Sequence, residues 1–206
     1  TELGSIRGRT DARRAQRAGM YVIPTLLMSQ GWGEDTRQNA PAAWAQLDLE
    51  ARADTARAWA QMAAERLKAE GITSRTWALG NETDYGFCGE YRLTTDLDVL
   101  RAEVWPRAAA LLRATADGVR QGCNGGELEF ILHLSRGHDP QFAVAFFQFM
   151  RAAGVPLDLA GLSYYPSAWG QAPTEAFEVT VTRLWQELDL NDLLITGPTN
   201  TNVMDV

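Results

Sequence analysis

Short apolar runs alternate along this chain with longer segments of helical periodicity, and this alternation most constrains the fold. The apolar runs, which we interpret as strands, are Met20–Met28, Arg75–Gly80, Leu128–Leu134, Leu157–Ser163 and Asp192–Thr196. The periodic segments, which we interpret as helices, are Thr10–Ala18, Leu49–Glu70, Asp96–Val119, Asp139–Ala153 and Thr174–Leu188. Strands that are apolar on both faces and separated by helices are typical of a parallel α/β sheet. Because the sequence contains no internal repeat or linker, we expect residues 1–206 to form a single domain.

Several residues mark the ends or the packing of the predicted helices. Gly71 and Gly154 each follow a helical pattern and suit the C′ position after a helix. Pro106 lies inside a helical pattern and predicts a kink or a break there. Three tryptophans within helical patterns are expected to pack in the core or between helix and sheet: Trp59, Trp105 and Trp185.

The residues at the strand ends separate two α/β architectures. A doubly wound nucleotide-binding sheet usually has a glycine-rich phosphate loop after a strand, and none of these strands is followed by GxGxxG or GxxxxGK[ST]. The strand ends are instead polar, aromatic and acidic, and they include Ser29 to Trp32, Asn81, Glu82, His133, Ser135, Tyr164 and Tyr165. Functional groups of a (β/α)8 TIM barrel gather at the carboxyl ends of its strands. The pattern therefore favours a barrel, and one that is incomplete, because a whole barrel needs eight strands where this chain has about five.

Charge and composition exclude several classes of partner. The formal net charge of −7 and the absence of a Lys/Arg cluster argue against nucleic acid and favour a neutral ligand. No apolar run reaches the ~18 residues of a membrane span, so no membrane partner is expected. Cys88 and Cys123 lack the spacing of a zinc site, and the sequence leaves open whether they pair or stay reduced. With two histidines, no HExxH and no GxSxG, we expect no metal, no cofactor and no serine triad.

Asn81 and Glu82 are the first candidates for chemistry. A carboxyl group at a strand end among apolar neighbours would have a raised pKa, as a general acid working near neutral pH needs. Asn81 would hydrogen-bond a substrate hydroxyl group. The alternative is structural: Asn81 caps a helix, and Glu82 is a solvated residue of its first turn.

Aromatic residues also lie after strands or in loops, where flat rings can stack on the C–H faces of sugars. They are Trp32, Trp44, Tyr85, Tyr164, Tyr165 and Trp169. For Trp44 and Trp169 taken singly, covering the core is the alternative. His133 lies within a strand pattern, where a lone histidine is more often a satisfied core or cleft residue than a metal ligand.

Four segments, in order, resemble glycoside hydrolase family 53, the endo-β-1,4-galactanases of a clan of retaining (β/α)8-barrel enzymes. They are RQNAPAAWAQLDLEARADTARAW, EGITSRTWALGNET, LHLSRGHDP and LDLAGLSYYPSAWG. The similarity extends from about Asp11 to Thr196. It implies that the five predicted strands are the third to the seventh of the barrel.

The resemblance also implies roles for residues. Glu82 matches the acid/base glutamate, and Asn81 matches the asparagine that precedes it. The implied cleft positions are Trp32, His133, Tyr164, Tyr165 and Trp169, and we add Tyr85 as a substrate-binding candidate. Retaining hydrolysis would pair Glu82 with a second carboxylate, ~5–5.5 Å away, that attacks the anomeric carbon.

The chain departs from the family pattern at three positions. Gly197 stands where the nucleophilic glutamate would be, so we expect this chain to hydrolyse little or nothing. Leu27 and Gln30 stand where the family has a histidine and an aspartate, which weakens any claim for galactan specifically. The first interpretation is a galactanase-like retaining hydrolase. The alternatives are a catalytically silent carbohydrate-binding relative, another β-glycosidase of the clan and, least favoured, a nucleotide-binding domain. The first implies a secreted monomer that binds neutral oligo- or polysaccharide.

Overall fold

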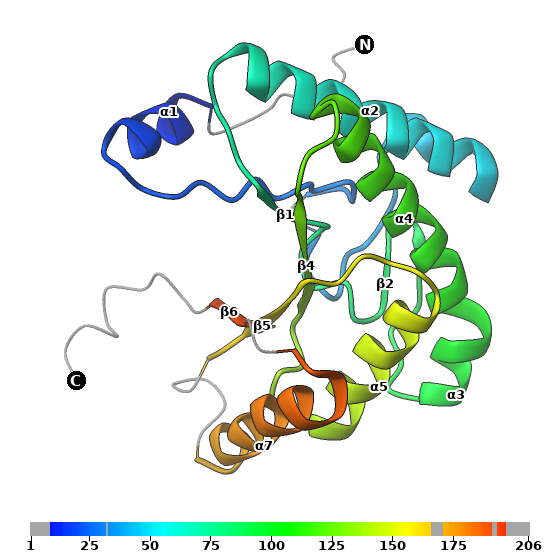
Figure 1. The fold of residues 1–206 in the computed structure, drawn as a ribbon. Helices are drawn as coiled ribbons and strands as arrows, with labels where there is room; N and C mark the ends of the chain where they lie inside the picture. Colours follow the sequence, from blue (N-terminus) through cyan, green and yellow to red (C-terminus); the bar gives the residue numbers. More distant parts are fainter. Residues whose placement is uncertain (1–8, 32, 166–170, 191–192, 197–206) are drawn as a thin grey trace.

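In a computed structural model, residues 9–31, 33–165, 171–190 and 193–196 are described (Figure 1). The helices are α1 (Arg9–Arg17), α2 (Leu49–Ala69), α3 (Leu97–Val99), α4 (Trp105–Gly122), α5 (Pro140–Ala152) and α7 (Gln171–Leu188), with a 3-10 turn η1 (Ala42–Trp44) and a π-helical segment η2 (Leu100–Val104). The strands are β1 (Thr76–Ala78), β2 (Gly86–Phe87), β3 (Glu90–Tyr91), β4 (Glu129–Leu134), β5 (Leu159–Ser163) and β6 (Leu193–Thr196). None of the helices that the structure describes is long and apolar enough to cross a membrane.

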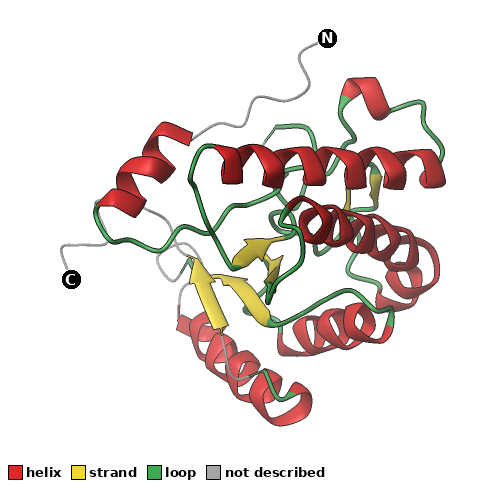
Figure 2. Ribbon diagram, turned by 45° about the horizontal axis from the view of Figure 1, so that its top comes forward, coloured by secondary structure: helices red, strands yellow, loops and turns green. Residues whose placement is uncertain are grey.

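The main sheet is parallel, with strand order β1-β4-β5-β6. It forms a curled half-barrel with the larger helices on its outer side, as Figure 2 shows in red around the yellow strands. The predicted α/β architecture of barrel type, incomplete and with parallel strands, is therefore confirmed.

The first predicted strand is present only as an isolated bridge. Thr25 pairs in parallel with Ala78 of β1, the backbone N–H of Leu26 donates to Ala78 O, and Ala78 N–H donates to the carbonyl of Pro24, both at 2.9 Å. Pro24 has no N–H to donate, so the ladder cannot extend through it. The segment takes the predicted place beside β1 without forming a regular strand.

The predicted helices are all present, and aspartate side chains cap the first turns of two of them. The side chain of Asp48 caps α2 by accepting from Ala51 N, and that of Asp139 caps α5 by accepting from Phe142 N. The kink or break predicted at Pro106 falls where the helix type changes: η2 ends at Val104, and Pro106 lies in the first turn of α4. A π-helical turn at this point is one of the recognised causes of a bend.

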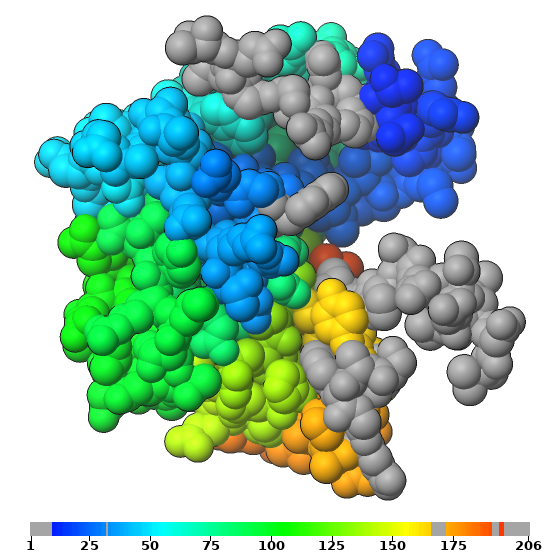
Figure 3. All heavy atoms as spheres, turned by 180° about the vertical axis from the view of Figure 1, so that it is seen from behind, coloured from blue at the N-terminus to red at the C-terminus, as the bar shows by residue number. Residues whose placement is uncertain are grey.

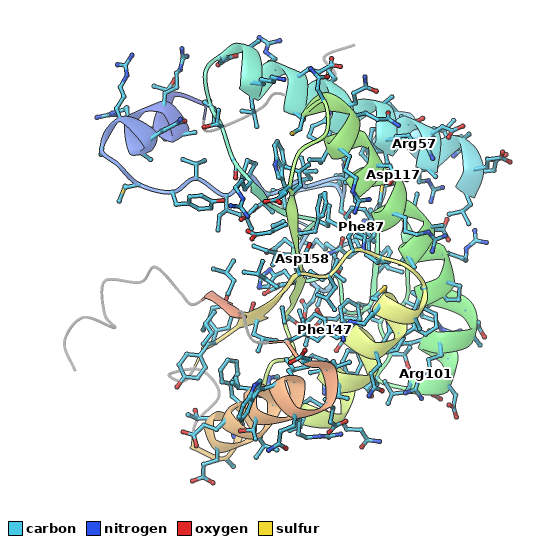
Figure 4. The ribbon with its side chains drawn as sticks, viewed as in Figure 1. Arg57, Phe87, Arg101, Asp117, Phe147 and Asp158 are labelled. Atoms are coloured by element: carbon cyan, nitrogen blue, oxygen red, sulfur yellow. The ribbon has the colours of Figure 1, made fainter. Side chains whose placement is uncertain are left out.

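The space between sheet and helices is filled by large apolar side chains. Phe87 and Phe147, both almost fully buried, lie in this layer, whereas Arg101 lies on the outer side of the helices (Figure 4). Trp105 is fully buried and its ring contacts three phenylalanines of α5. Those rings are Phe142, Phe146 and Phe149.

Individual core predictions had mixed outcomes. Trp44 is 7% exposed and packs in the core, which was the structural alternative for it. Trp185 is 59% exposed, so the prediction that it packs in the core or between helix and sheet is wrong. Leu184 and Leu188 face the core, and Trp185 is turned by about 100° from its neighbour on the same helix. Cys88 and Cys123 are free thiols.

Candidate active site

The chain turns sharply where β1 delivers Asn81 and Glu82. Gly80 has φ +86° and Glu82 has φ +47°, so two residues within three adopt left-handed backbone conformations. A Cβ atom at Gly80 would lie 2.8 Å from side-chain atoms of both Phe87 and Thr83, so this position requires glycine. No helix begins here, and Glu82 is half-buried, so the alternative in which Asn81 caps a helix is wrong.

Gln38 holds this turn in place from a neighbouring loop. Its Nε2 donates to the carbonyl oxygens of Asn81 (2.9 Å) and Glu82 (3.1 Å), and also to that of Gly33 (2.7 Å). Its Oε1 accepts from the hydroxyl group of Ser29. A left-handed glutamate costs about 1–3 kcal/mol and persists only where surrounding contacts determine it. The buried amide of Gln38 supplies those contacts.

The carboxyl group of Glu82 faces the ends of β4 and β5. Ser163 Oγ donates to Oε1 at 2.7 Å, and the backbone N–H of Asp35 lies 3.4 Å from Oε2. Burial is the largest influence on this group and raises its pKa, and the negative charges of Asp35 and Glu34 act in the same direction. The raised pKa agrees with the expectation from the sequence.

His133 joins Asn81 to Ser163 across the site. Its Nδ1 is 2.8 Å from Asn81 Oδ1, and its Nε2 is 3.1 Å from Ser163 Oγ. Burial lowers the pKa of His133 to about 4, so the imidazole is neutral at neutral pH. The structure thus brings together three residues that lie at or just beyond the ends of three strands of the sheet.

A cavity of about 210 Å³ opens beside this cluster. Its lining residues are Thr25, Ala78, Gly80, Asn81, Glu82, Ile131, His133, Tyr165 and Leu194. Figure 3 shows this face of the molecule, where the blue segment that includes residues 25 to 40 borders the yellow end of β5. A carboxyl group with a raised pKa, an amide and a tyrosine ring around one cavity can bind a neutral hydroxylated ligand and transfer a proton to it.

The predicted aromatic residues fall into three groups. Tyr165 lines the cavity with Glu82. Tyr164 packs instead against Phe177 of α7, with ring centroids 4.7 Å apart. Tyr85 is buried on the helical side of the sheet, where its ring meets Phe142 and its hydroxyl group accepts from Arg136 at 3.1 Å. Trp32, Trp169 and the predicted nucleophile position Gly197 lie outside the described residues.

Asp84 is a site residue that the sequence did not indicate. Its carboxyl group is fully buried and accepts from the backbone N–H groups of Ser135 (2.7 Å) and Arg136 (3.0 Å). Ser135 Oγ lies 2.5 Å from Asp84 Oδ2 and 3.0 Å from Asp35 Oδ2. Asp84 therefore ties the end of β4 to the loop that contacts Glu82. One acidic residue in a turn gives no sequence signal for such a role.

Metal binding has no support in the part of the chain that is described. No group of three or more His, Cys, Asp or Glu side chains there is arranged to hold an ion.

Comparison with known proteins assigns the chain to a family. The profile of Glycosyl hydrolase family 53 matches residues 7–196. A probable arabinogalactan endo-β-1,4-galactanase A of Aspergillus terreus is 28% identical over 178 residues, which are 84% of this chain and 49% of the relative. An endo-β-1,4-galactanase of Bacillus subtilis is 25% identical over 154 residues, which are 75% of this chain and 33% of the relative.

Solved structures show the same fold. The GH53 catalytic domain of Ignisphaera aggregans aligns with a TM-score of 0.78 at 22% identity, over 93% of this chain and 49% of that domain. A fungal β-1,4-galactanase aligns with the same TM-score at 21% identity, over 92% of this chain and 56% of its own. The chain spans about half the length of the fungal curated relative. On the family match over residues 7–196, this chain belongs to glycosyl hydrolase family 53.

Proposed function

We propose that this chain carries the acid/base part of a retaining β-glycoside hydrolase that acts on β-1,4-linked galactan. The observation that carries the proposal is Glu82, a half-buried carboxyl group with a raised pKa that lines a cavity at the carboxyl end of a parallel strand. The galactanase names of the relatives support the substrate class. The net charge of −7 suits a neutral polysaccharide.

The chemistry follows from the protonation state of Glu82. Burial raises the pKa of Glu82 and so favours its protonated form. In the proposed reaction this form protonates the glycosidic oxygen as the bond to the sugar breaks. The resulting carboxylate then takes a proton from the incoming water. Asn81 has a second amide hydrogen available for a sugar hydroxyl group, and Tyr165 offers a ring at the same cavity.

The nucleophile is the missing part of this proposal. The retaining mechanism needs a second carboxylate ~5–5.5 Å from the first, and the resemblance puts Gly197 at that position. We therefore expect the chain of 206 residues to bind galactan and to hydrolyse little of it. The same glycine favours a second candidate function, a carbohydrate-binding relative without catalysis.

Rescue with formate tests the proposal, because a small carboxylate can replace an absent nucleophile. The rate of phenol release from phenyl β-galactoside, whose leaving group needs a proton from the acid, is measured with and without sodium formate. Binding of β-1,4-galactotetraose is measured by calorimetry. We expect binding, no release without formate, and release with formate. Glu82→Gln should reduce the rescued rate by about 10²–10⁴-fold, the usual contribution of general acid–base catalysis.

The control is Glu127→Gln, the same chemical change at an exposed position, which should leave the rescued rate unaltered. Turnover without formate that Glu82→Gln abolishes would show that the chain contains its own nucleophile. Binding without rescue would support the silent relative. No binding would reject both functions.

A further inference from the structure

The hydroxyl group of Ser163 lies between two acceptors of the site. Its Oγ is 2.7 Å from Glu82 Oε1 and 3.1 Å from His133 Nε2. Ser163 is fully buried, and His133 is only 9% exposed. A hydroxyl group has one hydrogen, so Ser163 can donate to only one of these two atoms at a time. The direction of this hydrogen bond is therefore coupled to the protonation of both neighbours.

The other side of the imidazole ring is oriented by Asn81. The Nδ2 of Asn81 lies 3.4 Å from the carbonyl oxygen of Gly33, which can only accept, so the amide oxygen points at His133. That oxygen is 2.8 Å from Nδ1, which must then carry the imidazole hydrogen and donate it. In a neutral ring Nε2 is then an acceptor, and it can accept the hydrogen of Ser163 when that hydroxyl group does not donate to Glu82.

We propose that Glu82, Ser163 and His133 form a proton relay in which the tautomer of His133 follows the protonation state of Glu82. With Glu82 protonated, its carboxyl O–H donates to Ser163, and the hydroxyl group of Ser163 donates to Nε2. Nδ1–H donates to Asn81, whose amide donates to Gly33. All of these hydrogen bonds run in the same direction, and every hydrogen meets an acceptor. This arrangement therefore stabilises the acid form of Glu82.

Loss of the proton from Glu82 reverses the direction of these hydrogen bonds. Ser163 then donates to the carboxylate, and Nε2 must carry the ring hydrogen in order to donate to the hydroxyl oxygen. The ring hydrogen moves from Nδ1 to Nε2 by exchange with water, and the relay as a whole has lost one proton, the one that Glu82 delivers. Nδ1 becomes an acceptor, with the backbone N–H of Glu82 3.4 Å away. The amide of Asn81 must turn and lose its bond to Gly33, so the ionised arrangement is the weaker one.

Other titratable groups lie near the relay, and their titrations must be distinguished from that of Glu82. Glu34 and Asp35 from the neighbouring loop raise the pKa of Glu82. Asp84 interacts with Glu82, and burial raises its pKa to about 7. Tyr165 lines the same cavity. Burial lowers the pKa of His133 to about 4, so at higher pH the ring stays neutral and can change only its tautomer.

Nuclear magnetic resonance reads the relay directly. The chain has two histidines, so a sample labelled with ¹⁵N-histidine shows two imidazole rings, and the control variant His138→Gln identifies the resonances of His133. We expect Nδ1 of His133 to change from the ¹⁵N shift of a protonated nitrogen to that of an unprotonated one, and Nε2 to change in the opposite sense. Both changes should occur at the pH at which the ¹³C carboxyl resonance of Glu82 titrates. A single tautomer of His133 throughout the titration of Glu82 would overturn the relay.

Three variants sharpen this experiment. Glu82→Gln keeps an N–H donor for Ser163 at every pH, so His133 should stay in the Nδ1–H tautomer; a tautomer change in this variant would contradict the relay. Ser163→Ala should leave Glu82 titrating while His133 no longer follows it. Asp84→Asn removes the nearby group with a pKa of about 7 and should leave the tautomer change of His133 in place.

The meaning of the relay for catalysis rests on the proposed function, but its test needs no turnover. If the tautomer of His133 follows the protonation of Glu82 but formate restores no hydrolysis, the relay proposal is supported and the proposed hydrolase function is rejected.

Discussion

Glu82 and Asp84 lie two residues apart and show how burial changes a carboxyl group. Glu82 is half-buried, held in a left-handed conformation by Gln38, and open to a cavity. Asp84 is fully buried and accepts hydrogen bonds from Ser135 and Arg136. Burial raises the pKa of both groups. Glu82 lines the cavity, where the proposed function has it exchange a proton with a ligand, whereas Asp84 organises the end of β4.

The pKa of Asp84 predicts a pH dependence of stability. Burial raises this pKa from 3.8 to about 7 in the folded chain, so the folded state binds more protons than the unfolded state between these pH values. The free energy of unfolding should therefore be highest, with respect to this group, below its unfolded pKa. It should fall by up to about 4 kcal/mol as the pH rises through about 7. Urea unfolding at a series of pH values measures this decrease.

Asp84→Asn should remove most of this pH dependence, because an amide does not titrate. Asp117→Asn is the matched control, since Asp117 is exposed on α4. An equal decrease in Asp84→Asn and in the unaltered chain would show that another group is responsible.

The α2–α4 pair shows how small residues bring two elements together. Alanines of α2 form a buried stripe, and Gly118 and Gly122 of α4 face it. A Cβ atom at Gly118 would collide with the carbonyl oxygen of Arg57, and it would lie 2.8 Å from the Cβ atom of Ala60. The close contact of the two helices therefore requires glycine at this position.

Gly118→Ala tests this packing. Alanine in a helix is favoured over glycine by about 1 kcal/mol when the position is exposed, so propensity alone predicts stabilisation. We expect instead a loss of about 1–3 kcal/mol in the free energy of unfolding, because the helices must move apart. Thermal or urea unfolding measures it, with Asp117→Ala on the exposed face of α4 as the control. A stabilised Gly118→Ala variant would mean that the two helices adjust without cost.

At the scale of the whole molecule, parallel strands bring together residues far apart in the sequence. Glu82, His133 and Ser163 follow or end three neighbouring strands, and parallel pairing places those ends on one edge of the sheet. The chain as a whole carries a net charge of −7. An acidic protein with a cavity at this edge is suited to an uncharged ligand.

The charge of the molecule predicts how binding responds to salt. A neutral oligosaccharide releases no counterions, so its affinity should be unaffected by raising the sodium chloride concentration. Calorimetry with β-1,4-galactotetraose at low and high salt measures this. A steep loss of affinity at high salt would point to an anionic or cationic ligand instead of a neutral polysaccharide.

The sequence by itself determined the helices, four regular strands and the barrel type, because apolar periodicity and helix caps act over short distances. It also indicated Asn81, Glu82 and His133 as candidates, since polar residues at the ends of apolar strands stand out locally, and the structure places the three around one cavity. It did not predict the isolated bridge at Thr25, the exposure of Trp185, or the packing of Tyr85 away from the cavity. Only the tertiary structure decided these, and it also joined Ser163, Gln38 and Asp84 to the site. Burial and hydrogen-bond direction depend on which distant segments meet, and a single sequence carries no record of those contacts.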